Sequence, residues 1–308
     1  MTDDNSTESR TMSLVLGSGG ARGLAHIGAI KALEERGFRI ESIAGSSMGA
    51  LVGGMHAAGR LDDYAEWVSK LAQSDVFKLV DWTFSGGGLI RGDRIIKRLK
   101  DMVGDARIED LPIDFTAVAV DIEQGREIWL SRGSLFDAIR GSIAIPGLFT
   151  PHRYQGRLLV DGGILNPVPV APTMRSLCDL TVVVNVNGPI SASRSRAAAK
   201  RAGGESEETD DSTLTERVRR FFNDLIERDG SAVEESEPGL AAMLMKSLET
   251  MQEVITRQHL AVFRPSLVVE VPKDACMIHE FHRADELIDL GYRRTINALD
   301  RLRDQSDE

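Results

Sequence analysis

The stretch Leu14-Val15-Leu16-Gly17-Ser18-Gly19-Gly20-Ala21-Arg22-Gly23-Leu24 (LVLGSGGARGL) decides how the rest of the sequence is interpreted. It joins a short apolar run of strand character to a glycine-rich turn, and a helical pattern follows. Small residues at such a turn leave backbone N–H groups pointing outward at the start of a helix, where they can bind negative charge. The stretch therefore predicts an anion-binding loop between a strand and a helix.

Two nucleotide-binding motifs begin in a similar way. A dinucleotide fingerprint that starts at Gly17 and Gly19 requires a small residue where Arg22 stands, because a large side chain there prevents close packing of the helix. Glu41 lies near the position of a ribose-binding acid, so this alternative stays open at this point. A P-loop is disfavoured because no Gly-Lys-Ser/Thr follows. A tight turn without a ligand is the remaining interpretation.

A second glycine motif follows the next strand-like run. The segment Ile43 to Leu51 contains Gly45-x-Ser47-x-Gly49, the one G-x-S-x-G of the sequence. It lies between a short apolar strand and a helical run, which is the context of a nucleophile elbow. The two glycines remove side chains that would collide across the sharp turn. Ser47 is therefore a candidate nucleophile that projects from the N-terminus of a helix.

Together, the two motifs favour acyl transfer over nucleotide binding. An acyl-transfer enzyme needs a nucleophile and fixed donors for the tetrahedral oxyanion, and each donor typically lowers the barrier by about 2.7 to 4 kcal/mol. The amides of Gly19, Gly20 and Ala21 are candidate donors. Arg22 is a candidate support for the oxyanion or for its loop, which runs from Gly17 to Gly23. The loop is thus expected to hold a transient oxyanion.

The candidate base is Asp161, which ends a strand pattern in the sequence RLLVDGG. Gly162 and Gly163 let the chain turn away without covering the carboxylate. A free aspartate, with a pKa of about 3.9, is a weak base at neutral pH, but partial desolvation raises its basicity and a hydrogen bond to Ser47 directs it. For an isolated Asp-Gly-Gly the alternative is a surface turn.

The six histidines offer alternative bases. In α/β-hydrolases an acid and then a histidine follow the serine in the chain, which would combine Asp161 with a later histidine. The candidates in that order are His259, His279 and His282. The elbow comes too early for that fold, because only one strand precedes the strand that leads to Ser47. His26 and His56 lie on helical patterns and are expected to pack or to face solvent, whereas His152 lies in a loop and stays a candidate.

Strand-like runs alternate with helical patterns along much of the chain, which predicts an α/β fold. The runs are Ser13–Leu16, Ile40–Ala44, Phe115–Asp121, Glu127–Leu130, Leu158–Val160, Thr181–Val186 and Leu267–Val271. Residues from about 190 to 238 change to a charged, low-complexity composition, including a helical piece at Val218–Ile226, and are expected to form a partly disordered insertion. Long amphipathic helices are expected at Leu240–Val262 and Ala284–Leu302.

Composition limits the class of protein. The chain has 308 residues, of which 42% are hydrophobic and 27% charged, and a formal net charge of -10, which disfavours nucleic acid as a partner. Two isolated cysteines indicate neither a disulfide framework nor a zinc site. The polar residues 1–11 do not resemble a signal peptide, and no apolar run is long enough to span a bilayer. We expect a cytoplasmic protein that needs no metal or cofactor, with transient peripheral contact with the inner membrane face left open.

Two further segments have both a functional and a structural interpretation. The residues from Val76 to Ile90 combine bulky apolar side chains with a glycine run, as expected of an acyl-chain wall or a mobile lid, or simply of a buried segment. Basic residues follow and could bind a phosphate headgroup or an anionic surface. They are Arg91, Arg94, Lys97, Arg98 and Lys100. The alternative for them is a solvated helix face.

The three motifs, in this order, resemble those of the patatin-like phospholipase family, in particular its stand-alone bacterial members. The resemblance runs from Leu14 to about Tyr292, excluding the insertion, and gives a hydrolase domain at 12–308 after a polar tail at 1–11. It implies a three-layer α/β/α fold with a mainly parallel sheet and a Ser47–Asp161 dyad without a catalytic histidine. One departure is Ser18, where many members have a third glycine, although Ser18 retains its backbone N–H.

The resemblance implies hydrolysis of acyl esters of lipids, either phospholipids, lysophospholipids or acylglycerols. A thioesterase or a carboxylesterase that acts on soluble acyl groups would need the same residues. A regulatory protein that keeps the fold without activity is a third alternative, which the intact Ser47, Asp161 and glycine loop disfavour. Headgroup, chain length and oligomeric state are not predicted.

Overall fold

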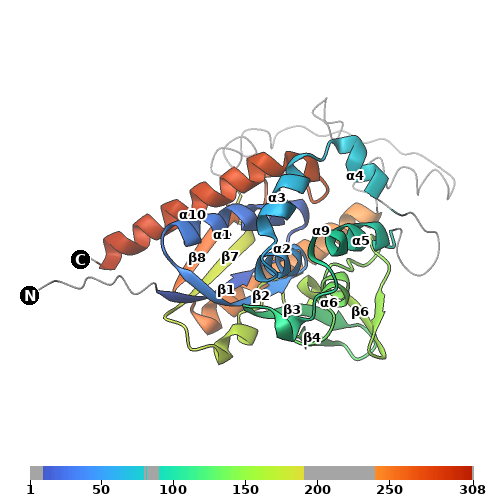
Figure 1. The fold of residues 1–308 in the computed structure, drawn as a ribbon, viewed down its shortest axis with the longest axis horizontal. Helices are drawn as coiled ribbons and strands as arrows, with labels where there is room; N and C mark the ends of the chain where they lie inside the picture. Colours follow the sequence, from blue (N-terminus) through green and yellow to red (C-terminus); the bar gives the residue numbers. More distant parts are fainter. Residues whose placement is uncertain (1–9, 80, 82–89, 191–239, 307–308) are drawn as a thin grey trace, which may run out of the picture.

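A central sheet of eight strands organises the part of the chain that the structure describes (Figure 1). The computed structural model describes residues 10–79, 81, 90–190 and 240–306. The strands are β1 (Thr11–Leu16), β2 (Arg39–Ser46), β3 (Asp114–Asp121), β4 (Arg126–Leu130), β5 (His152–Tyr154), β6 (Arg157–Asp161), β7 (Leu180–Gly188) and β8 (Leu267–Pro272). Every strand-like run of the sequence lies in one of them, and the three-residue β5 is the strand that the pattern did not indicate.

The sheet is mainly parallel, which confirms the expected fold class. Its order is β5-β6-β3-β2-β1-β7-β8, and β4 pairs with β3 beside this path. Strands β3, β2, β1, β7 and β8 run parallel to one another, whereas β4, β5 and β6 join in antiparallel pairs. Because β1 and β2 are adjacent and parallel, the loops that follow them meet at one edge of the sheet. The two glycine motifs are those loops.

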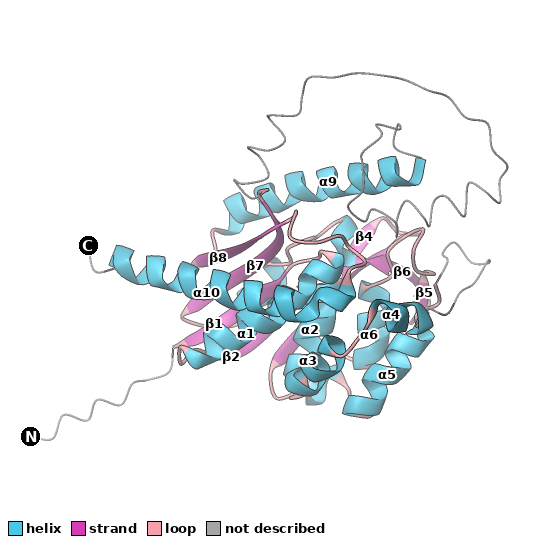
Figure 2. Cartoon of the chain, turned by 90° about the horizontal axis from the view of Figure 1, so that it is seen from above, coloured by secondary structure: helices cyan, strands magenta, loops and turns pink. Residues whose placement is uncertain are grey.

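Helices cover both faces of the sheet, which gives the three layers (Figure 2). The α-helices are α1 (Ala25–Glu35), α2 (Met48–Ala57), α3 (Leu61–Ser69), α4 (Gln73–Leu79), α5 (Asp93–Val103), α6 (Leu135–Ser142), α9 (Leu240–Phe263) and α10 (Ala284–Ser306). Short 3-10 helices are η1 (Gly20–Leu24), η2 (Ile108–Asp110), η3 (Gly162–Ile164), η4 (Ala171–Arg175) and η5 (Phe281–Arg283). Helices α1, α2 and α10 lie on one face and α9 lies on the other. The two long helices expected near the C-terminus are confirmed as α9 and α10.

The side chains of β1 show how the sheet divides the core. Leu14 and Leu16 point to the larger core beneath α1, α2 and α10. Val15 points to the opposite face, where it packs with Val183 and with Leu260 of α9. This alternation follows from the two-residue period of a strand. It fixes the C-terminal half of α9 against the sheet, close to the end of β1.

The basic residues of α5 lie on a solvated helix surface. Lys97 pairs with Asp101 at 3.0 Å, one helical turn away, and Lys100 lies 3.5 Å from Asp105. The guanidinium of Arg98 lies over the ring of Trp67. These contacts favour the structural interpretation of the cluster over headgroup binding.

Three of the sequence expectations lie outside the described residues, wholly or in large part. They are the tail at 1–11, most of the segment from Val76 to Ile90, and the insertion at about 190–238 with its helical piece. Among the helices that are described, none combines the length and the apolar character that crossing a bilayer requires.

Candidate active site

Ser47 occupies the sharp turn between β2 and α2. Its backbone has φ +56° and ψ -123°, a conformation that a residue with a side chain rarely adopts. The turn closes only because its flanking residues are small. A Cβ on Gly45 would overlap the backbone of Gly49, and a Cβ on Gly49 would overlap the carbonyl group of Leu16. The strained backbone and the close approach of β1 are those of a nucleophile elbow.

The strand register brings Asp161 next to Ser47. Ser46 pairs with Val118 of β3, and Asp161 at the end of β6 pairs with Ala119, one residue further along β3. Ser47 and Asp161 therefore flank β3 at the same level. The Ser47 hydroxyl donates a hydrogen bond of 2.6 Å to Oδ2 of Asp161. The side chains that the sequence separates by more than a hundred residues form one buried pair, exposed by only 3% and 4%.

The environment of Asp161 makes it more basic than an ordinary aspartate. Burial raises its pKa to about 7, although hydrogen bonds from the Ser47 hydroxyl and the Gly163 amide act in the opposite direction. The Gly163 amide donates to Oδ1 at 2.7 Å, which leaves Oδ2 for Ser47. A Cβ on Gly162 would overlap the carbonyl oxygen of Val118. The Asp-Gly-Gly turn thus orients the carboxylate and keeps it against β3.

The amides of the first glycine loop are not equivalent. Gly17 donates to the carbonyl of Val184 at 3.0 Å, Ser18 donates to that of Pro167, and Ala21 donates to that of Ile278. The amides of Gly19 and Gly20 have no acceptor within the described part of the chain. Both glycines line the same cavity as Ser47 and Asp161. Of the three donors expected from the sequence, Ala21 is thus engaged elsewhere.

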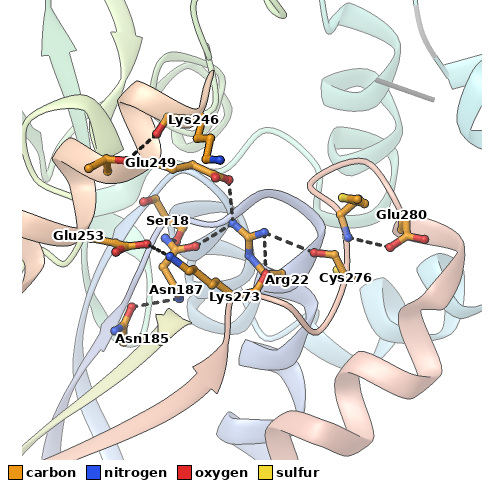
Figure 3. Close-up of polar contacts among 12 residues, drawn as sticks. Ser18, Arg22, Asn185, Asn187, Lys246, Glu249, Glu253, Lys273, Cys276 and Glu280 are labelled. Atoms are coloured by element: carbon orange, nitrogen blue, oxygen red, sulfur yellow. Dashed lines mark hydrogen bonds and ion pairs between the residues drawn. The ribbon is translucent and has the colours of Figure 1, made fainter. Parts of the chain in front are cut away.

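Arg22 holds the loop from behind (Figure 3). Its guanidinium donates to the backbone carbonyls of Lys273 at 3.2 Å and Cys276 at 3.3 Å. It also donates to Oδ1 of Asn187 at 2.8 Å and lies 3.5 Å from a carboxylate oxygen of Glu249 on α9. All four partners are protein groups, so Arg22 ties the loop to three distant segments. This geometry supports a role in shaping the loop.

Asn187 and His26 complete this support, and the sequence did not indicate either role. The side-chain amide of Asn187 donates to the carbonyl of Ser18 at 2.7 Å. Buried His26 lies with Nε2 2.8 Å from the carbonyl oxygen of Gly17, and burial lowers its pKa to about 4. It is therefore neutral at pH 7 and donates through Nε2. Gly23 lets the loop pack on α2, because a Cβ there would overlap Met48.

Ser142 is a third residue whose role the sequence did not indicate. The backbone amide of Ser47 donates to the Ser142 hydroxyl at 2.9 Å, and that hydroxyl donates to the carbonyl of Val118 at 2.5 Å. Ser142 is the last residue of α6 and is fully buried. It therefore anchors the elbow to β3. A single serine at the end of a helical pattern gives no signal of this contact in the sequence.

None of the six histidines, all of which lie in the described part of the chain, lines the cavity at Ser47. His152 contacts Asp137 at 3.0 Å, and His259 lies 3.4 Å from the carbonyl of Val168. The α/β-hydrolase arrangement, in which Asp161 would orient a later histidine toward Ser47, is therefore not found among the described residues. The carboxylate of Asp161 contacts Ser47 directly.

The cavity that contains Ser47 is small and largely apolar, with a volume of about 60 Å³. Its apolar side chains come from four separate segments. They are Ile145, Pro146, Ile164, Met245, Leu248 and Ile278. Polar side chains of Ser18, Arg22, Glu249 and Gln252 also line it, beside Ser47 and Asp161. The site thus combines a paired serine, two free amides and an apolar wall.

Comparisons with known proteins identify the family of this chain. The sequence profile described as patatin-like phospholipase matches residues 14–174, which include both glycine motifs and Asp161. An uncharacterized NTE family protein of Mycobacterium tuberculosis is 40% identical over 346 residues, covering 98% of this chain and 95% of the relative. Lysophospholipase nte1 of Emericella nidulans is 32% identical over 185 residues, covering 58% of this chain and 12% of that protein.

Among solved structures, VipD from Legionella pneumophila aligns with a TM-score of 0.43 and 14% sequence identity, covering 95% of this chain and 67% of VipD. The profile match and the relative from Mycobacterium tuberculosis, which this chain matches over almost its whole length, carry the assignment. The chain belongs to the patatin-like phospholipase family.

Proposed function

We propose that this chain is a serine acyl hydrolase that cleaves acyl esters of lipids through a Ser47–Asp161 dyad. The observation that carries the proposal is the direct 2.6 Å hydrogen bond from the Ser47 hydroxyl to a buried carboxylate of raised pKa. A carboxylate with a pKa near the working pH is a good general base. A large fraction of it is ionised at that pH, and the ionised form is more basic than that of an ordinary aspartate. The free amides beside the pair supply the other requirement for acyl transfer.

In the acylation step Ser47 Oγ attacks the ester carbonyl carbon while its proton passes to Oδ2 of Asp161. The carbonyl oxygen becomes an oxyanion, for which Gly19 and Gly20 are the proposed donors. Collapse of this intermediate breaks the bond to the alcohol, which takes the proton from Asp161 as it leaves. The acyl group then remains on Ser47 as an ester.

Deacylation repeats these steps with water as the nucleophile. Asp161 removes a proton from water, the hydroxide adds to the acyl carbon, and the same two amides hold the oxyanion. Ser47 then leaves with the proton from Asp161, and a free carboxylic acid is released. The two residues return to their starting protonation states.

We propose lysophospholipids as the substrate class. The apolar wall of the cavity at Ser47 suits an acyl chain. Proteins named lysophospholipase are 32% identical to this chain over 185 residues, in Emericella nidulans and in Candida glabrata. A lysophospholipid, which carries an acyl ester, fits both observations.

A substrate series tests this choice. Release of free acid from lysophosphatidylcholine, diacyl phosphatidylcholine and acyl-CoA of the same chain length is measured with the full chain, and the Ser47→Ala variant serves as the blank. We expect kcat/KM for the lysophospholipid to exceed that for the other two by about tenfold or more. Faster turnover of acyl-CoA would instead assign the protein as a thioesterase.

The raised pKa of Asp161 predicts a specific pH profile. Since only the ionised carboxylate accepts the Ser47 proton, kcat/KM should rise about tenfold per pH unit below the pKa and level off above it. The midpoint is expected near pH 7, where burial places the pKa of Asp161. The measurement is kcat/KM for a soluble p-nitrophenyl ester from pH 5 to 9. A midpoint near pH 4 would contradict this prediction, because it would assign the proton transfer to a carboxylate of ordinary pKa.

A further inference from the structure

Helix α9 presents an unusual apolar surface to solvent. Met243 is 49% exposed, Leu244 60%, Met251 54% and Val254 40%. At 100° per residue, these four side chains lie within an arc of about 100° on the helix. We call this set the α9 stripe. Four large apolar side chains gathered on one helix face are the signature of a binding surface, whereas single exposed residues are ordinary.

The opposite side of α9 closes the active site. Met245 and Leu248 line the catalytic cavity together with Glu249 and Gln252. The stripe and the cavity wall are therefore two sides of the same helical turns.

The charged residues of α9 differ in whether they are paired. The two acidic residues near the cavity are paired inward, Glu249 with Arg22 and Glu253 with Lys273 (Figure 3). Lys246 and Arg257 are exposed, and neither has an ion-pair partner within the described part of the chain. By helical geometry both project within about 60° of Met243, at the border of the stripe. An acidic protein of net charge -10 thus presents free cations beside its exposed apolar stripe.

We propose that the α9 stripe, with Lys246 and Arg257 at its border, docks this protein onto the surface of an anionic phospholipid layer. An apolar helix face flanked by Lys and Arg fits the headgroup boundary, where the apolar side chains enter and the cations meet phosphate. Docking there brings the cavity wall of α9 beside the substrate. The inference rests on the proposed lipid hydrolase function and adds the surface that delivers the lipid.

The chemistry favours a lipid layer over a protein partner. A protein interface would require complementary acidic groups opposite Lys246 and Arg257, whereas an anionic lipid layer supplies them at every position. Two of the four side chains of the stripe, Met243 and Met251, are long and unbranched, and such side chains adapt to a fluid surface. A second copy of this chain is the main competing occupant.

The experiment compares three variants of the full chain by co-sedimentation with vesicles of phosphatidylglycerol and phosphatidylcholine. Met251→Asp/Val254→Asp removes the stripe, and Lys246→Ala/Arg257→Ala removes the cations. Met174→Asp/Leu177→Asp is the matched control, because those side chains are 66% and 100% exposed and lie outside α9. None of the substituted residues lines the cavity. Turnover of a soluble p-nitrophenyl ester and circular dichroism report folding and the catalytic site.

We expect the wild type and the control to bind mixed vesicles, and the stripe variant to bind about tenfold or more weakly with unchanged soluble-ester turnover. Each lost cation should weaken binding to the anionic vesicles about fivefold and leave binding to pure phosphatidylcholine nearly unchanged. Equal binding by the stripe variant and the wild type would overturn the proposal. So would light scattering that shows a wild-type dimer and a monomeric stripe variant.

The readouts separate this inference from the proposed function. If the wild type releases acid from lysophospholipids but does not bind vesicles, the docking surface is wrong and the hydrolase stands. If it binds vesicles through α9 but no lipid ester is cleaved, the proposed function is wrong and the docking surface stands.

Discussion

Replacing Ser47 by alanine is expected to abolish ester hydrolysis and covalent labelling by a fluorophosphonate probe. The change removes one hydroxyl from an elbow whose shape is set by Gly45, Gly49 and the Ser142 contact, so the fold should persist. Loss of the nucleophile of a serine hydrolase lowers kcat on the order of 10⁶-fold. Probe labelling, hydrolysis of a p-nitrophenyl ester and circular dichroism measure the three expectations.

The neighbouring serine provides a matched control. Ser46 is the last residue of β2 and directly precedes Ser47. It is buried, and its hydroxyl has no hydrogen-bond partner within the described part of the chain. Ser46→Ala should therefore keep labelling and turnover close to those of the wild type. Retention of most activity by Ser47→Ala would sink the proposed mechanism, because no other nucleophile has been assigned.

The second large effect is expected from Asp161→Asn. Asparagine keeps the size of the side chain and can still accept the Gly163 amide hydrogen bond, but it cannot take the Ser47 proton. Acylation should fall by about 10² to 10⁴, the range for loss of a general base. The measurement is the pre-steady-state acylation rate with a p-nitrophenyl ester at neutral pH, with circular dichroism to establish folding.

Histidine variants decide between a dyad and a triad. Separate replacements by glutamine should each cost far less than Asp161→Asn, since no histidine lines the cavity at Ser47. The residues to replace are His152, His259, His279 and His282. If one of these variants folds and is as inactive as Asp161→Asn, then a histidine takes the proton and Asp161 has another role.

Local patterns were sufficient for most of the fold. The strand runs could be predicted because parallel strands buried on both faces, such as β1 and β7, are nearly continuous apolar runs. The turn at Gly125, with φ +62°, joins β3 and β4 as a hairpin. Strand β5 could not be found in this way, because its three residues, HRY, are half exposed and depend on pairing with β6.

The candidate site was predictable where its residues stand in motifs. Ser47, Asp161 and the glycine loop carry their chemistry in short spacings that can be read directly. The engagement of the Ala21 amide by Ile278 could not be foreseen, because the acceptor lies in a distant segment whose approach depends on tertiary packing. The same holds for Asn187 and Ser142, which act through single hydrogen bonds to backbone groups.

The glycine loop also bears on how this hydrolase can be divided. The family profile ends at residue 174, and that segment already contains Ser47 and Asp161. Yet the carbonyls that accept from Gly17 and Ala21 belong to Val184 and Ile278, which lie after that boundary. A recombinant fragment cut at the end of the profile would therefore keep both reacting side chains and lose the scaffold of the loop. The smallest autonomous unit of catalysis is therefore expected to extend through the segment between β8 and α10, which contains Ile278.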